Sequence, residues 1–212
     1  MVDDSLVREA ILDIQPYVPG KPIGEVKREL GLEKVIKLAS NENPLGPAPE
    51  VIETMQEAVK GVSIYPDGYA FKLRQRLSQK LGVDEEQLIF GNGSDELLAM
   101  LAQAFLTAGE EVIIGGTTFS EYRFAGNLMG AKVTQISLAD YRYDLTAMAE
   151  AISEATKMVF VCNPNNPTGT IVSKEEVEQF LEQVPEDVLV VFDEAYYEYV
   201  TSDQYPETIN YL

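Results

Sequence analysis

Short apolar runs alternate with amphipathic stretches through the last two thirds of the chain. The apolar runs have the length of buried strands and predict strands at residues 87–90, 111–114, 132–137, 157–162 and 188–192. Apolar positions at helical spacing predict helices at residues 97–106, 145–152 and 174–183, and another that ends at Met129. This alternation favours an α/β fold with a doubly wound, mostly parallel sheet and right-handed crossovers.

The first third of the chain lacks this alternation. Residues 5–13 have apolar positions at helical spacing, and residues 14–22 form an extended, proline-rich arm by composition. An amphipathic helix is predicted from Pro47 to Gly61, and a second helix over residues 70–81.

Bulk composition narrows the possible partners. Of the 212 residues, 45% are apolar, which is ordinary for a globular protein with a buried core. The formal net charge of −19 argues against nucleic-acid binding, because a protein that neutralises phosphates needs a basic surface. An anionic membrane surface is disfavoured for the same reason, so we expect neither as a partner.

The residue inventory excludes several kinds of chemistry. The chain has no histidine and a single cysteine, Cys162, so a His/Cys zinc site and Ser-His or Cys-His nucleophiles are excluded. Cys162 lies in an apolar run, where we expect it to pack as a small hydrophobe. No apolar run has the length of a membrane span, and the N-terminus does not resemble a secretory signal, which predicts a cytosolic protein.

The apolar run that ends at Cys162 leads into a loop rich in Asn, Pro and Gly at residues 163–169. Ser173 then marks the start of the next helix. Such junctions at the carboxyl ends of strands are where open α/β sheets bind ligands. A turn is the ordinary explanation of this composition. Because each proline fixes its own φ and restricts the residue before it, the loop can also aim the side-chain amide of Asn166.

A second junction between strand and helix is rich in glycine. Residues 91–96 follow the predicted strand at 87–90, and the N–H groups at a helix start lack intrahelical partners, so they can bind an anion such as phosphate. A plain N-cap by Ser94 and Asp95 explains the same residues equally well. Glu96 stands where a dinucleotide fingerprint needs its third glycine, and no Gly-Lys-Ser/Thr of a P-loop is present in this segment.

The run Asn-Pro-Asn-Asn-Pro-Thr-Gly at residues 163–169 resembles the signature loop of the fold-type I aminotransferases, which use pyridoxal phosphate. Asp193 follows the last apolar run, and the resemblance implies that its carboxylate keeps the pyridine nitrogen protonated, so that the ring can draw electrons from the substrate. It also implies that Asn166 and Tyr196 hydrogen-bond the O3′ oxygen of the cofactor.

The same resemblance assigns the remaining cofactor contacts. Phe119 matches the aromatic residue that stacks on the pyridine ring, although Thr117 stands where the family usually has proline. Backbone groups of Ser94, Asp95 and Glu96 are implied to bind the cofactor phosphate.

The opening of the chain resembles a narrower group, the histidinol-phosphate aminotransferases, through a Gln-Pro-Tyr arm and the segment at residues 38–47. In that group Tyr17 would lie near the substrate, and Asn41 would belong to the segment that lines the entrance. Tyr65 alone is as well explained as a surface aromatic before a turn. The resemblance implies instead that Tyr65 reaches the cofactor phosphate of a partner subunit, so a homodimer is expected.

Some parts of the family pattern are not in this chain. The lysine that forms a Schiff base with the cofactor, an arginine for the substrate carboxylate and a small C-terminal domain are all expected beyond Leu212. Lys157 opens a predicted strand and Lys174 starts a predicted helix, so neither matches that lysine. We predict an N-terminal arm and helix at residues 1–46, and a cofactor-binding large domain at residues 47–212 that is incomplete at its C-terminal end.

The predicted activity of the longer parent protein is ping-pong amino transfer between histidinol phosphate and 2-oxoglutarate or glutamate. An aromatic aminotransferase, a threonine-phosphate-type decarboxylase and a non-catalytic cofactor-binding or dimerisation fragment are alternatives. A nicotinamide oxidoreductase is the weakest one, because Glu96 breaks the glycine fingerprint. The prediction requires four places to surround one cavity, namely residues 94–96, Phe119, Asn166 and Asp193.

Overall fold

The computed structural model describes residues 4–12, 14 and 20–212. Within these residues the chain forms two compact units. One contains the described residues up to Ile14 together with Ile89–Leu212, and the other contains the described part of Gln15–Leu88. The predicted division into residues 1–46 and 47–212 stays a prediction.

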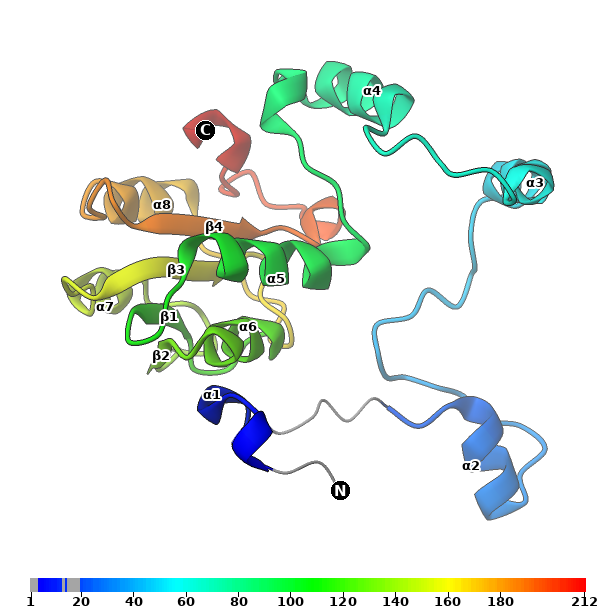
Figure 1. The fold of residues 1–212 in the computed structure, drawn as a ribbon, viewed down its shortest axis with the longest axis horizontal. Coiled ribbons are helices and arrows are strands. Elements are labelled where there is room, and N and C mark those ends of the chain that lie inside the picture. Colours follow the sequence, from blue (N-terminus) through cyan, green and yellow to red (C-terminus); the bar gives the residue numbers. More distant parts are fainter. Residues whose placement is uncertain (1–3, 13, 15–19) are drawn as a thin grey trace. The chain divides into compact units, whose positions relative to one another are not determined.

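A four-stranded parallel sheet forms the centre of the first unit, with strand order β2-β1-β3-β4. Its strands are β1 (Glu111–Gly115), β2 (Lys132–Ile136), β3 (Thr156–Cys162) and β4 (Leu189–Asp193), as Figure 1 shows. Strands β1 and β3 lie in the middle and are almost wholly buried, which explains their continuous apolar sequences. Four of the predicted strands are thus confirmed.

The strand predicted at residues 87–90 is wrong. A short 3₁₀ helix, η3 (Glu85–Gln87), ends inside that range, and residues 88–90 join no sheet among the described residues. Leu88 does have extended backbone angles, with φ −109° and ψ 131°. An apolar, extended segment becomes a strand only when its N–H and C=O groups pair with a neighbouring strand, and the local pattern cannot supply that neighbour.

Helices cover both faces of the sheet (Figure 1), with α5 (Gly93–Phe105) packed on α6 (Glu121–Met129) and α7 (Leu145–Glu150) packed on α8 (Lys174–Leu181). The chain crosses the sheet in one direction from β1 to β2 and in the other from β2 through β3 to β4. Right-handed crossovers therefore place α6 on one face, and α7 and α8 on the other. The doubly wound α/β fold class is confirmed.

Shorter elements complete this unit. They are η1 (Asp4–Leu6), α1 (Glu9–Leu12), η4 (Tyr197–Tyr199) and η5 (Thr208–Tyr211). Ser173 caps α8 through a reciprocal capping box with Glu176, as the sequence pattern at that helix start indicates.

The second unit consists of helices with exposed apolar side chains. These helices are α2 (Ile23–Leu30), α3 (Pro49–Ala58), η2 (Val59–Gly61) and α4 (Phe71–Leu81), followed by the short η3, and none of the five contains a buried residue. Helix α2 lies in a stretch for which the sequence pattern predicts no element. The guanidinium of Arg74 lies 4.3 Å from the ring centroid of Tyr69 and donates a 2.6 Å hydrogen bond to the carbonyl of Glu85. No helix in the described ranges is both long enough and apolar enough to cross a bilayer.

Candidate active site

The carboxyl ends of the four parallel strands share one edge of the sheet, where ligands bind in open α/β folds. The loop after β1 carries Phe119, the loop after β3 is the Asn-Pro loop at residues 163–169, and β4 ends at Asp193. Cys162 and Asp193 are register partners, and the N–H of Asn163 donates to the carbonyl of Asp193 at 2.9 Å. The Asn-Pro loop therefore starts directly beside the acid.

The three asparagines of the Asn-Pro loop have different environments. Asn163 and Asn165 are buried, with 1% and 2% of their surfaces exposed, whereas Asn166 is half-buried. The side-chain oxygen of Asn163 accepts from the N–H of Val172 at 3.0 Å and so closes the loop. Asn165 donates its N–H to Thr170, 2.9 Å from the carbonyl oxygen. The peptide bonds before both prolines of this loop are cis.

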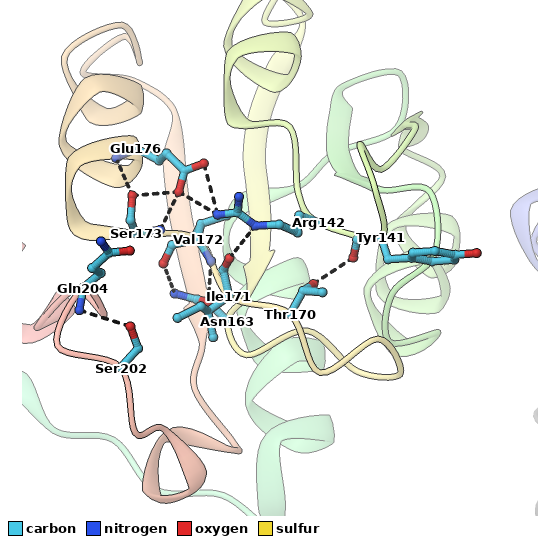
Figure 2. Close-up of polar contacts among 10 residues, drawn as sticks. All are labelled: Tyr141, Arg142, Asn163, Thr170, Ile171, Val172, Ser173, Glu176, Ser202 and Gln204. Atoms are coloured by element: carbon cyan, nitrogen blue, oxygen red, sulfur yellow. Dashed lines mark hydrogen bonds and ion pairs between the residues drawn. The ribbon is translucent and has the colours of Figure 1, made fainter.

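An arginine contacts the segment between this loop and α8, as Figure 2 shows. Arg142 donates from Nε to the carbonyl of Ile171 at 3.0 Å and forms an ion pair with Glu176 at 3.0 Å. The Glu176 carboxylate also accepts from the N–H of Ser173 at 2.6 Å. Although burial raises the pKa of Glu176, the hydrogen bonds from Ser173 and the charge of Arg142 lower it overall. The Glu176 carboxylate thus binds the start of α8 directly and, through Arg142, the segment that precedes it.

A chain of hydroxyl and amide groups joins the loops after β1 and β3. The Tyr143 hydroxyl donates to Oγ1 of Thr118 at 2.7 Å, and Thr118 donates to Oδ1 of Asn165 at 2.9 Å. Asn165 returns a hydrogen bond from Nδ2 to the carbonyl of Thr117 at 3.0 Å. Gly115 leaves room for this arrangement, since a Cβ there would lie 2.8 Å from Cζ of Tyr143. The network fixes the loop that carries Phe119 relative to the loop that carries Asn166.

Replacing Thr118 by valine should lower the free energy of unfolding by about 1–3 kcal/mol, because it leaves hydrogen-bonding groups of Tyr143 and Asn165 without a partner. Urea denaturation of both proteins measures the difference. The Thr118→Ser variant keeps the hydroxyl and is expected to lose less than half as much. Equal losses in the two variants would contradict the assigned role of the hydroxyl.

A buried tyrosine connects Phe119 with Asp193. The Tyr122 side chain is fully buried, and its hydroxyl donates to Oδ2 of Asp193 at 2.7 Å. Its ring stacks on Phe160 with centroids 4.9 Å apart and meets Phe119 edge-on at 5.7 Å. The other oxygen of Asp193, Oδ1, accepts from the N–H of Ala195 at 3.1 Å. The sequence pattern does not reveal this role of Tyr122, because an aromatic residue near the start of a helix is indistinguishable from an ordinary core residue.

The predicted phosphate-binding segment forms the first turn of α5. The helix begins at Gly93, so the alternative interpretation of Ser94 and Asp95 as its N-cap is wrong. The Glu96 carboxylate accepts from the N–H of Asn92 at 2.6 Å and from its Nδ2 at 2.9 Å, which holds the preceding turn against the helix. Backbone N–H groups in a first turn have no intrahelical acceptor, so this geometry suits an anion.

Helix α5, whose first turn is the predicted phosphate segment, packs on α6. Burial raises the pKa of Glu121, the first residue of α6, and the negative charge of Asp95 raises it further. The structure thus brings the loops of Phe119 and Asn166 and the acid Asp193 together through direct contacts, and places the predicted phosphate segment beside the helix that follows Phe119.

Four other residues are predicted from the sequence to belong to the site. Tyr196 is half-buried at the start of η4, with its ring centroid 6.4 Å from that of Tyr199. Asn41 and Tyr65 belong to the second unit; Asn41 has a positive φ of 50°, and Tyr65 is 97% exposed. Tyr17 lies outside the described residues. The roles of these four residues stay predictions.

A doubly wound parallel sheet with an acid, an Asn-Pro loop and an aromatic ring at its carboxyl edge defines an α/β protein of the aminotransferase type. The chain belongs to the aminotransferase class I and II family, whose model matches residues 33–211.

Comparison with individual proteins points to a narrower group within this family. The chain is 55% identical over 205 residues to a histidinol-phosphate aminotransferase of Moorella thermoacetica, an alignment that covers 97% of this chain and 53% of that protein. It is similar, with a TM-score of 0.82 and 27% identity, to the crystal structure of histidinol-phosphate aminotransferase from Sinorhizobium meliloti in complex with pyridoxal-5′-phosphate, covering 93% of this chain and 55% of that one. The chain spans about half the length of the curated relatives it matches.

A structure with a different activity is also similar. The L-threonine-O-3-phosphate decarboxylase from Porphyromonas gingivalis gives a TM-score of 0.62 at 26% identity, covering 73% of this chain and 47% of that chain. Fold and edge geometry alone therefore do not separate amino transfer from decarboxylation.

Proposed function

We propose that this chain is part of a pyridoxal-phosphate-dependent aminotransferase that converts histidinol phosphate and 2-oxoglutarate to imidazole acetol phosphate and glutamate, in histidine biosynthesis. The similarity to histidinol-phosphate aminotransferases over nearly the whole chain supports this substrate. The main support for pyridoxal phosphate as the cofactor is Asp193. This acid lies at the edge of the sheet where open α/β folds bind ligands, and both its carboxylate oxygens accept hydrogen bonds from this protein.

The residues at this edge fit the chemical groups of pyridoxal phosphate. Asp193 would face the ring nitrogen, and Phe119 offers a flat apolar face for the ring. Asn166 and Tyr196 would hydrogen-bond O3′. The backbone groups of Ser94, Asp95 and Glu96 in the first turn of α5 would bind the phosphate. When bound, the cofactor supplies an electron sink that stabilises negative charge on the Cα of the substrate.

Each residue has a defined task in this proposal. The Asp193 carboxylate holds a proton on the ring nitrogen, which increases the capacity of the ring to accept electrons. Asn163 and Asn165 are buried within the loop, so they fix its backbone while Asn166 contacts the ligand. The network through Thr118 keeps the Phe119 and Asn166 loops at a constant separation.

None of the three lysines in the sheet unit is proposed to form the Schiff base. Lys132 and Lys157 lie at the amino ends of β2 and β3, the edge opposite Asp193, and they pair with Glu111 and Asp187 at 2.7 and 3.3 Å. Lys174 starts α8 and pairs with Glu178 at 3.7 Å.

We further propose that the protein acts as a cytoplasmic homodimer. Helix α3 carries exposed apolar side chains, and Tyr65, also exposed, would reach the cofactor phosphate of the partner subunit. Exposed apolar side chains gathered on a helix suit a subunit interface. Tyr17 and Asn41 would contact the substrate.

The test of the function is the formation of glutamate from histidinol phosphate and 2-oxoglutarate by the protein at its native length. We expect glutamate and imidazole acetol phosphate in equal amounts, with a double-displacement kinetic pattern. Carbon dioxide release from threonine phosphate, without glutamate formation, would favour the decarboxylase. Lack of both activities, together with an unchanged absorbance of added pyridoxal phosphate, would contradict the cofactor as well.

A further inference from the structure

We propose that Tyr122 is a positioning residue for the cofactor: its hydroxyl fixes the Asp193 carboxylate in the orientation that binds the ring nitrogen, a role that rests on the proposed function. The contact joins residues 71 positions apart, from the first turn of α6 to the end of β4. The local backbone around either residue does not bring these two side chains together, so the contact depends on the fold.

The tyrosine itself is held rigidly. Its side chain is fully buried, and its ring is stacked on Phe160 at an interplanar angle of 8° and contacts Phe119 at 81°. Two aromatic contacts in different directions restrict both tilt and translation of the ring. The hydroxyl oxygen is therefore presented to Asp193 from a fixed point.

The carboxylate needs such a fixed donor. The terminal torsion of an aspartate side chain has a broad energy minimum, so the orientation of Asp193 depends on its hydrogen-bond partners. Its Oδ2 accepts from Tyr122 at 2.7 Å and its Oδ1 from the N–H of Ala195 at 3.1 Å. Because each carboxylate oxygen can accept about two hydrogen bonds, an acceptor position remains for a ring N–H.

The tyrosine also stays protonated. Burial raises the pKa of Tyr122, and the neighbouring Cys162 and Asp193 raise it further. The hydroxyl is thus protonated and a hydrogen-bond donor at neutral pH. A merely structural role, in which Asp193 only satisfies a buried hydroxyl, predicts a loss of stability without any change in cofactor discrimination.

The experiment compares two ligands on the protein at its native length. One is pyridoxal phosphate, and the other is its deaza analogue, in which a C–H group replaces the ring nitrogen. The ratio of their dissociation constants reports the interaction with the ring nitrogen alone, because all other groups of the ligands are shared. We expect the Tyr122→Phe variant to reduce the preference for pyridoxal phosphate about tenfold.

The control is Thr156→Val. Thr156 is also buried, and its hydroxyl donates a 2.8 Å hydrogen bond to Glu111 at the opposite edge of the sheet, away from the acid. Both variants lose one buried hydroxyl, so chemical denaturation should report similar losses of stability, while only the Tyr122 variant changes the preference. An unchanged or increased preference in Tyr122→Phe would overturn the proposal.

A second pair of variants serves if Tyr122→Phe does not fold. Phe160→Leu removes the ring on which Tyr122 stacks and should lower the preference, whereas Phe180→Leu, an equally buried change in α8, should not. Equal preferences in the two variants would contradict the positioning role. Failure of the unsubstituted protein to bind either ligand would contradict the proposed function itself, so the two failures are distinguishable.

Discussion

Replacing Asp193 by alanine is expected to reduce kcat/KM for amino transfer by about a thousandfold. A preorganised group that meets charge as it develops in the transition state contributes on the order of 10²–10³ in rate, and the acid that keeps a pyridine nitrogen protonated is such a group. The protein itself orients this acid, since Tyr122 and the N–H of Ala195 each hold one carboxylate oxygen. The loss should fall mainly on kcat.

The measurement is steady-state kinetics at saturating cofactor, with two further substitutions of Asp193. Asp193→Asn keeps the shape but not the charge and should lose nearly as much activity as alanine. Asp193→Glu keeps the charge at a displaced position and should retain part of the rate. A fully active Asp193→Asn variant would remove the acid from the proposed chemistry.

A matched control for these variants is Asp187→Asn. Asp187 lies just before β4 and pairs only weakly with Lys157, since its side chain is 73% exposed. The same chemical change at this position should leave kcat/KM unchanged. A similar loss at both positions would indicate a general effect on the strand instead of a role in the site.

The sequence could predict the parts of the fold that local patterns determine. Strand β3 is a continuous apolar run because it is buried on both faces, and the Ser173 cap with Glu176 three residues later marks the start of α8. The positions of Asp193 and the Asn-Pro loop follow from the same logic, because Asp193 ends one apolar strand and the loop follows another, and the two strands share an edge.

Pairing over long distances could not be predicted in this way. Residues 88–90 are apolar and Leu88 has an extended backbone, yet whether they form a strand depends on a neighbour that the local pattern does not specify. The hydrogen bond from Tyr122 to Asp193 also results from packing between distant segments. The same is true of the burial of Asn163, in contrast to the half-buried Asn166. In the sequence, Tyr122 is one more aromatic residue on an amphipathic helix.

A buried carboxylate at the opposite edge of the sheet makes the largest predicted contribution to stability. Glu111, at the start of β1, is 3% exposed and accepts hydrogen bonds from Lys132, Thr134, Ser153 and Thr156, at 2.6–2.9 Å. Burial raises the pKa of Glu111, but these donors together lower it to about 2. Lys132 makes the largest single contribution to this lowering, and the three hydroxyl groups add to it, although solvent screens part of the lysine charge because its side chain is 72% exposed.

Glu111→Gln is therefore expected to lower the free energy of unfolding by about 3 kcal/mol at neutral pH, the equivalent of the pKa shift from 4.5 to about 2. Because the pKa is lower in the folded state, this stabilisation is fully present above pH 4.5 and is lost as the pH falls to about 2. Urea denaturation across this range should show the difference between the two proteins narrowing towards low pH. The exposed Glu154→Gln variant should differ by less than about 0.5 kcal/mol throughout. A pH-independent difference for Glu111→Gln would show that the amide disturbs packing and that the carboxylate charge contributes little.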